Sequence, residues 1–178
     1  GQCAKPALAG RATKLDVSGA RGVHSVQPAV ISLPNLTELG ARLSCADISA
    51  YSDLAKSRGM KLFMDGARFA NAVATGSDSP ADLTWRSGVD AISFGATKNG
   101  AMAAEALVFF TPEEAKLAEF HRKRAGHLWS KQRFLAAQFD AYLHDNLWLE
   151  LAASEEAEIE IIKGFLPTQL SADEMHQA

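Results

Sequence analysis

The chain has 178 residues, of which 47% are hydrophobic and 22% are charged, and its formal net charge at pH 7 is −3. This length and composition are typical of one globular domain. The net negative charge gives no electrostatic basis for binding to nucleic acid or to an acidic membrane, both of which attract strongly basic proteins. Its 2 cysteines form no Cys-x-x-Cys pair, and no apolar stretch approaches the roughly 20 residues that cross a bilayer. We therefore expect a cytoplasmic protein with neither a thiol redox motif nor a zinc site.

Apolar runs bounded by Pro, Gly and Asn predict the strands of the chain. They lie at 28–33, 60–64, 90–96 and 104–110. Between the first two, the capping-box pattern of Ser44 and Asp47 begins a helix that ends near Gly59. Shorter helices are expected at 66–75 and 80–86. Strands that alternate with helices are typical of an α/β layer with a mostly parallel sheet.

In the last third of the chain the sequence predicts only helices. Thr111 can cap a helix in which Pro112 takes the first position and Glu114 reaches back to the cap. We expect this helix to continue to about Arg124. Further helices are predicted at 129–143 and 147–165.

Two apolar runs end in a single charged residue that is followed by a turn. Asp65 follows the strand at 60–64, and Lys98 follows the strand at 90–96. Ligands of open α/β sheets bind at the carboxyl ends of the strands. Pyridoxal phosphate needs an amine for a Schiff base and an acid against its ring nitrogen. Taken alone, however, a helix cap at Asp65 and a surface lysine at Lys98 are the more common explanations.

Other residues near these two have chemistry that suits the same ligand. Arg68 lies one helical turn after Asp65, where its guanidinium can clamp the carboxylate of an amino acid or form a surface pair with Asp65. The hydroxyl of Thr97, next to Lys98, can bond a phosphate oxygen. A basic cluster over 121–133 is either a solvated helix face or an anion-recognition surface. Its histidines have no acidic partner at ligand spacing, so no metal site is expected.

Four sequence motifs occur in the following order along the chain: MDGARFANAV, SPADLTWRSGVDAISFGATKNG, AAEALVFF and RKRAGHLWSKQRFLAAQFDAYL. Together they resemble the bacterial low-specificity L-threonine aldolases, in the β-eliminating lyase group of pyridoxal phosphate enzymes. The resemblance extends from about Gly22 to about Leu151. It implies a fold-type-I, aminotransferase-like large domain. It also implies a pyridoxal phosphate-dependent aldehyde-lyase that cleaves L-threonine and L-allo-threonine to glycine and acetaldehyde.

The resemblance also implies roles for individual residues. Lys98 would form the Schiff base with the cofactor, Asp65 would pair with its ring nitrogen, and Arg68 would bind the substrate carboxylate. The remaining implied positions are Thr97 and Arg133 at the cofactor, Lys123 at the substrate, and Glu38 or His24 as the base at the substrate hydroxyl. Because family members form homotetramers built from dimers, self-association is expected.

Parts of the family pattern have no counterpart in this sequence. These are a Gly-Thr phosphate loop, a histidine that stacks on the cofactor ring, and a carboxyl-terminal small domain. We therefore expect a piece of a longer enzyme, with a poorly matched segment at 1–20, a partial cofactor-binding large domain at 21–151 and a divergent helical tail at 152–178. Two alternatives remain open: another pyridoxal phosphate-dependent aldolase or β-eliminating lyase, or a fragment that cannot hold the cofactor.

Overall fold

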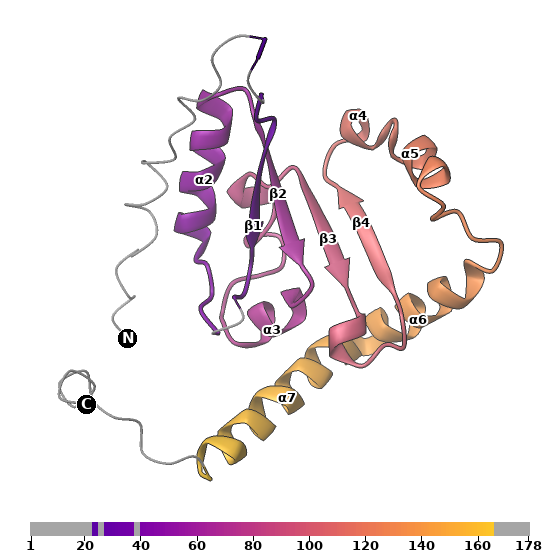
Figure 1. Ribbon diagram of the computed structural model, residues 1–178. Helices are drawn as coiled ribbons and strands as arrows, with labels where there is room; N and C mark the ends of the chain where they lie inside the picture. Colours follow the sequence, from indigo (N-terminus) through magenta and orange to yellow (C-terminus); the bar gives the residue numbers. More distant parts are fainter. Residues whose placement is uncertain (1–22, 25–26, 38–39, 166–178) are drawn as a thin grey trace.

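The computed structural model describes residues 23–24, 27–37 and 40–165 (Figure 1). Its centre is a four-stranded sheet in the order β1-β2-β3-β4. The strands are β1 (Val30–Pro34), β2 (Lys61–Gly66), β3 (Ala91–Gly95) and β4 (Glu105–Phe109). The first three are parallel, and β4 runs antiparallel to β3. The predicted α/β layer with a mostly parallel sheet is confirmed, as are all four predicted strands.

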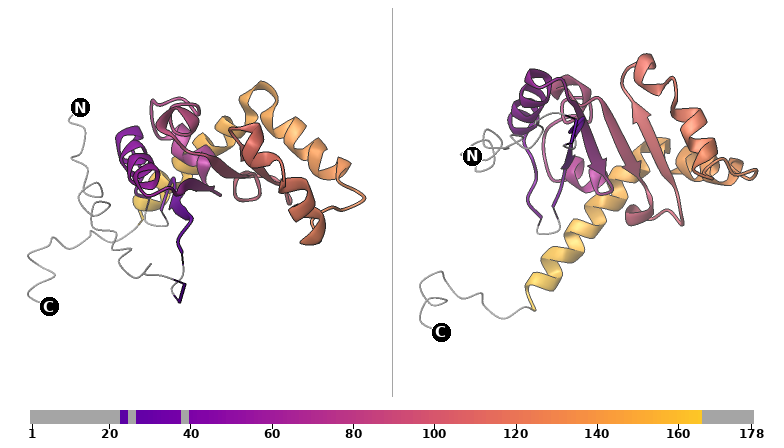
Figure 2. Two further views of the ribbon diagram at one scale, coloured as in Figure 1. Left: turned by 90° about the horizontal axis from the view of Figure 1, so that it is seen from above. Right: turned by 45° about the horizontal axis from the view of Figure 1, so that its top comes forward.

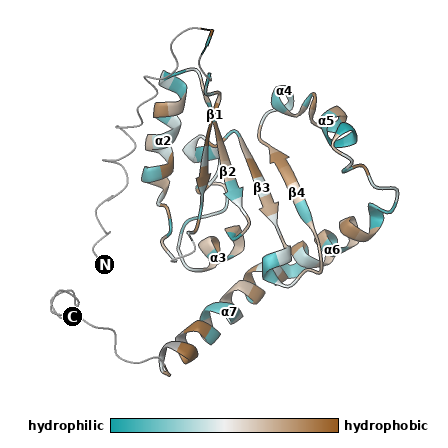
Figure 3. Cartoon of the chain, viewed as in Figure 1, coloured by the Kyte–Doolittle hydropathy of each residue, from teal (hydrophilic) through white to brown (hydrophobic). Residues whose placement is uncertain are grey.

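One face of the sheet holds the core. Leu33, Met64 and Ile92 lie side by side across the three parallel strands, and each is at most 7% exposed. Because side chains alternate along a strand, the neighbouring residues point to the opposite face. That second face is more open to solvent, with Val30 53% exposed and Leu107 56% exposed. Figure 3 shows the hydrophobic colouring of the strands that supply these residues.

The helices are α2 (Cys45–Ser57), α3 (Phe69–Ala74), α4 (Pro112–Ala115), α5 (Ala118–Arg124), α6 (Arg133–Leu143) and α7 (Leu147–Lys163). Short 3-10 turns are η1 (Trp85–Ser87), η2 (Thr97–Asn99) and η3 (His144–Asn146). Figure 2 shows α2 beside β1 and β2, and α7 as a long helix that passes α3. Among the described residues, no helix combines the length and apolar character that crossing a membrane demands.

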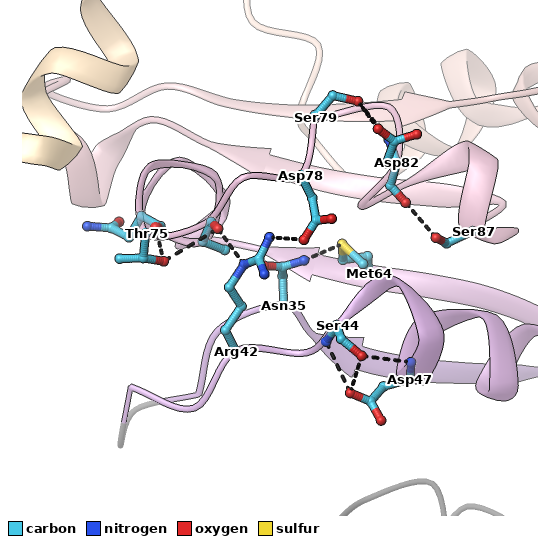
Figure 4. Close-up of polar contacts among 12 residues, drawn as sticks. Asn35, Arg42, Ser44, Asp47, Met64, Thr75, Asp78, Ser79, Asp82 and Ser87 are labelled. Atoms are coloured by element: carbon cyan, nitrogen blue, oxygen red, sulfur yellow. Dashed lines mark hydrogen bonds and ion pairs between the residues drawn. The ribbon is translucent and has the colours of Figure 1, made fainter. Parts of the chain in front are cut away.

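The predicted start of α2 is confirmed. Ser44 Oγ accepts a hydrogen bond from the Asp47 amide at 3.1 Å, and the Ser44 amide donates to Asp47 Oδ2 at 3.1 Å (Figure 4). These reciprocal bonds satisfy amides that would otherwise have no partner at the helix amino terminus. Ile48 and Ala55 from the same helix are at most 1% exposed in the core.

Two helix predictions are wrong. The segment predicted as a helix at 80–86 forms turns followed by η1, because the Thr84 backbone, with φ −126° and ψ −107°, lies outside the helical region. The single helix expected from Thr111 to Arg124 is divided into α4 and α5.

The capping box predicted at Thr111 is prevented by the partner that Glu114 takes. Thr111 makes no side-chain cap bond, and Glu114 forms an ion pair with Lys61 at the start of β2. The carboxylate therefore does not reach back to the helix start, and the predicted capping box does not form. Similarly, α6 begins at Arg133 and not at 129.

An aromatic cluster joins the helical end of the chain to the sheet. Phe94 on β3 contacts Phe69, Phe139, Tyr142 and Trp148, with ring centroids 5.8 to 6.1 Å apart. These partners come from α3, α6 and α7. Aromatic contacts at such distances add to the free energy gained by burying the rings. They fix α6 and α7 beneath the carboxyl ends of the strands (Figure 1).

Candidate active site at the carboxyl ends of the strands

A cavity of about 680 Å³ lies where the parallel strands end. Its wall includes Thr37 from the loop after β1, Arg68 from the turn after β2, and Lys98 from the turn after β3. Residues of α3 and α7 complete it. Open α/β sheets bind ligands at this edge, and the volume lies within the range of small-molecule sites.

Lys98 lines the cavity from η2, the short turn that begins directly after the buried residues Gly95 and Ala96. Its side chain is exposed. Within the described part of the chain its ε-amine has no hydrogen-bond or ion-pair partner. An accessible amine on a cavity wall is a suitable nucleophile for a carbonyl carbon.

Asp65 is exposed near the end of β2, in register with Ser93 on β3. Its Oδ1 accepts a hydrogen bond from the Ala67 amide at 3.0 Å. Helix α3 has Arg68 as its N-cap residue, so Asp65 caps the turn and not the helix. The adjoining Gly66 has no room for a side chain, because a Cβ there would lie 2.5 Å from the Ser93 carbonyl oxygen. Asp65 itself is not among the residues of the cavity wall.

Arg42 also lines the cavity, although no sequence pattern indicated it. Its Nε donates to the Ala72 carbonyl at 2.7 Å, and its guanidinium forms an ion pair with Asp78 at 2.7 Å (Figure 4). These partners lie 30 and 36 residues away in the sequence. A local pattern therefore cannot reveal that this arginine is held in place on the cavity wall.

The acidic patch of the last helix contributes to the same cavity. Glu155 and Glu156 from α7 line it together with Asn71 from α3, whose side-chain amide donates to Glu155 Oε2 at 2.9 Å. The wall thus carries the cations Arg42, Arg68 and Lys98 and two carboxylates. This mixture of charges suits a ligand that is itself zwitterionic, since each sign then has an opposite partner.

The other sequence-predicted residues lie elsewhere or outside the described residues. Thr97 Oγ1 accepts a hydrogen bond from the Ala104 amide at 3.2 Å. Glu38 is outside the described residues, although Thr37 beside it lines the cavity. Exposed residues that are not part of the cavity wall are His24, Lys123 and Arg133. The described residues contain no group of three or more His, Cys, Asp or Glu side chains that could hold a metal ion.

Comparison with known proteins gives consistent results. The β-eliminating lyase family matches residues 7–174. A low-specificity L-threonine aldolase of Pseudomonas aeruginosa is 43% identical over 130 residues, which are 73% of this chain and 38% of that protein. The enzyme of the same name from another Pseudomonas strain is 41% identical over 131 residues, again covering 38% of its length.

A solved structure of a threonine aldolase from Leishmania major superposes with a TM-score of 0.71 at 33% sequence identity. The match covers 81% of this chain and 42% of that one. The chain therefore spans about two fifths of the length of the relatives that it matches.

Proposed function

The chain belongs to the β-eliminating lyase family, and from this membership we propose that it supplies the cofactor-binding core of a pyridoxal phosphate-dependent aldehyde-lyase. The proposed reaction is aldol cleavage of L-threonine and L-allo-threonine to glycine and acetaldehyde. The observation that carries the proposal is that Lys98 and Arg68, which come from the turns after two adjacent strands, line one cavity.

The donor set at the strand ends fits the two reactive parts of pyridoxal phosphate. Lys98 offers an amine to the aldehyde of the cofactor, and Asp65 offers a carboxylate to its ring nitrogen. Both residues lie at the carboxyl ends of neighbouring parallel strands. A carboxylate beside a pyridine nitrogen keeps that nitrogen protonated, because opposite charges favour each other's ionised form.

When bound, the cofactor supplies an electron-accepting ring that stabilises negative charge at the substrate Cα. Arg68 would hold the substrate carboxylate in a bidentate pair, which fixes the position of Cα. Orientation of this kind is a large part of catalysis, since it removes the entropy cost of alignment from the reaction step.

The base that removes the proton of the substrate hydroxyl is assigned to Glu38 or His24. Glu38 has the stronger case, because the preceding residue Thr37 lines the cavity whereas His24 does not. Of the remaining site residues, Thr97 and Arg133 are proposed to contact the cofactor phosphate. Lys123 is proposed to approach the substrate. We also propose that the complete enzyme is a dimer of dimers.

β-Elimination is the second candidate function, and membership of the β-eliminating lyase family favours it. The two reactions release different products. Aldol cleavage of a β-hydroxy amino acid gives glycine and an aldehyde, whereas β-elimination from serine or cysteine gives pyruvate. A panel of these substrates, assayed for aldehyde and for pyruvate, separates the two candidates.

The proposal is tested by adding pyridoxal phosphate, reducing with borohydride and locating the cofactor on peptides by mass spectrometry. We expect the label on Lys98 in the wild-type chain and its loss in Lys98→Ala. Lys116→Ala is the matched control, because Lys116 is exposed on the segment between α4 and α5, outside the cavity wall. Equal labelling of Lys98 and of surface lysines at saturating cofactor would overturn the proposal and leave a fragment that cannot hold the cofactor.

A further inference from the structure

The turn that carries Lys98 is anchored on both sides. On one side, Thr97 Oγ1 accepts the Ala104 amide at 3.2 Å. On the other side, Asn99 is 2% exposed, whereas Lys98 between the two anchors is exposed. The next residue, Gly100, has a φ of +98°, a conformation that favours glycine, and it allows the chain to reverse toward β4. The backbone of Lys98 is therefore held while its side chain extends from the turn.

The anchor at Asn99 consists of two short hydrogen bonds from one amide group. Asn99 Nδ2 donates to Tyr142 Oη at 2.6 Å and to the Trp148 carbonyl oxygen at 2.7 Å. Tyr142 belongs to α6 and Trp148 to the first turn of α7. A single side chain thus joins the lysine turn to both of the helices that lie beneath the sheet.

This anchor is maintained at a cost. Tyr142 and Trp148 are 3% and 8% exposed, so the bonds of Asn99 are enclosed by aromatic rings. The Asn99 Oδ1 atom is buried and has no hydrogen-bond partner among the described residues. A buried acceptor without a partner is unfavourable. A leucine of similar size would avoid this cost, but it would leave the Trp148 carbonyl and the lysine turn without their connection.

Helix α7, to which Trp148 belongs, also supplies part of the cavity wall. Glu155 follows Trp148 by two turns of α7, about 10 Å along the helix axis, and it lines the cavity with Lys98. The Asn99 bond to the Trp148 carbonyl therefore sets the spacing between the wall that carries Lys98 and the wall that carries Glu155. A shift of α7 relative to η2 would change the space in front of the ε-amine.

We propose that Asn99 is a positioning residue for Lys98, acting mainly through its hydrogen bond to the Trp148 carbonyl of α7. The inference rests on the proposed function, in which the Lys98 amine bonds the cofactor. Misplacement of a reacting group by about 1 Å can slow its reaction by about 10²-fold. Loss of the Asn99 donors is thus expected to lower the reactivity of Lys98.

The test compares three variants of the full chain. Asn99→Asp keeps an oxygen for the Tyr142 hydroxyl but cannot donate to the Trp148 carbonyl. Tyr142→Phe removes the hydroxyl and keeps the bond to Trp148. Asn99→Ser introduces no charge and replaces Asn99→Asp in the comparison if Asn99→Asp does not fold. Each is treated with pyridoxal phosphate and borohydride, and the rate of labelling at Lys98 is divided by the rate at Lys116 in the same sample.

We expect this ratio to fall by up to about 10²-fold in both Asn99 variants and to stay within a few fold of wild type in Tyr142→Phe. Hydrogen exchange at 96–101 and at 147–152 should speed up in the Asn99 variants. The labelling is carried out well below the melting temperature of each variant, because the loss of buried hydrogen bonds also lowers stability. An unchanged ratio with unchanged exchange overturns the role of Asn99. If wild-type Lys98 is not labelled preferentially, the proposed function fails, and the exchange rates alone then decide whether Asn99 holds the turn.

Discussion

The side-chain amide of Asn71 donates a hydrogen bond to Glu155 Oε2 at 2.9 Å and so connects α3 to α7. Asn71 is 7% exposed, and both residues line the cavity that holds Lys98. The two helices are separated by more than 70 residues in the sequence. This contact therefore joins two helices that both contribute to the cavity wall.

Replacing Asn71 with alanine should weaken the connection between α3 and α7. We expect the free energy of unfolding to fall by about 1.5 kcal/mol, because a hydrogen bond to a charged acceptor is lost while Glu155 stays accessible enough to be hydrated. Urea unfolding measures the change, and hydrogen exchange over 153–159 should increase. Ser154→Ala is the control, since its hydroxyl bonds only the Glu150 carbonyl of its own helix. Equal stability of the two variants would contradict a structural role for the Asn71 contact.

The elements that could be predicted from the sequence are those fixed by local chemistry. The capping pair Ser44 and Asp47 forms as expected, and each apolar run forms its strand. Lys98 was also identified locally, because a lone charge at the end of an apolar strand is costly unless it serves a ligand or faces solvent. Arg68 was identified by its spacing of one helical turn from Asp65. The sheet then brings their two turns to one cavity.

The features that were missed depend on partners far away in the chain. Glu114 was expected to cap its own helix, but its carboxylate pairs with Lys61 more than 50 residues earlier. Arg42 reached the cavity wall through bonds to Ala72 and Asp78, which no local spacing reveals. The contribution of α7 to the site was likewise hidden, since an acidic patch on a helix is most often a solvated face.

The outer edge of β4 should promote association of the chain. Within the described sheet β4 pairs only with β3, and Leu107 on its open face is 56% exposed. An exposed apolar edge strand is a template for pairing with another chain, and a lysine on such a strand opposes it. We expect Leu107→Lys to reduce concentration-dependent association in sedimentation velocity experiments.

Met102→Lys is the control for that experiment, because Met102 is 89% exposed but precedes the strand. If both lysine variants reduce association equally, general charge and not the edge of β4 is responsible.

Tyr142 should make the fold sensitive to alkali. Burial raises the pKa of its hydroxyl above the ordinary value near 10, while the hydrogen bond from Asn99 acts in the opposite direction. The folded chain therefore holds this proton more tightly than the unfolded chain. Stability from this group is fully present below about pH 10 and is lost as the pH rises through the folded pKa.

The free energy of unfolding is measured between pH 8 and 11 for the wild type and for Tyr142→Phe. We expect the wild type to lose more stability over this range than the variant, which has no hydroxyl to ionise. Lys61, whose pKa is raised by its hydrogen bond to Glu114, contributes to the decline in both proteins and cancels in the comparison. Parallel curves for the two proteins would show that the Tyr142 hydroxyl ionises equally readily in the folded and the unfolded chain, and so would contradict the effect of burial.

Asp65→Asn separates the charge of Asp65 from its structural bond. An asparagine oxygen can still accept the Ala67 amide hydrogen, which Asp65 Oδ1 accepts at 3.0 Å, so the turn after β2 should be retained. Without the carboxylate, the pKa of the ring nitrogen of bound pyridoxal phosphate should fall by about 1 to 3, since an opposite charge nearby favours the protonated ring. Nitrogen-15 NMR of labelled cofactor across pH measures this change. Asp53→Asn, an exposed carboxylate on α2, should leave it unaffected. A ring pKa that is the same in both variants would remove Asp65 from the cofactor site, even if Lys98 is still labelled.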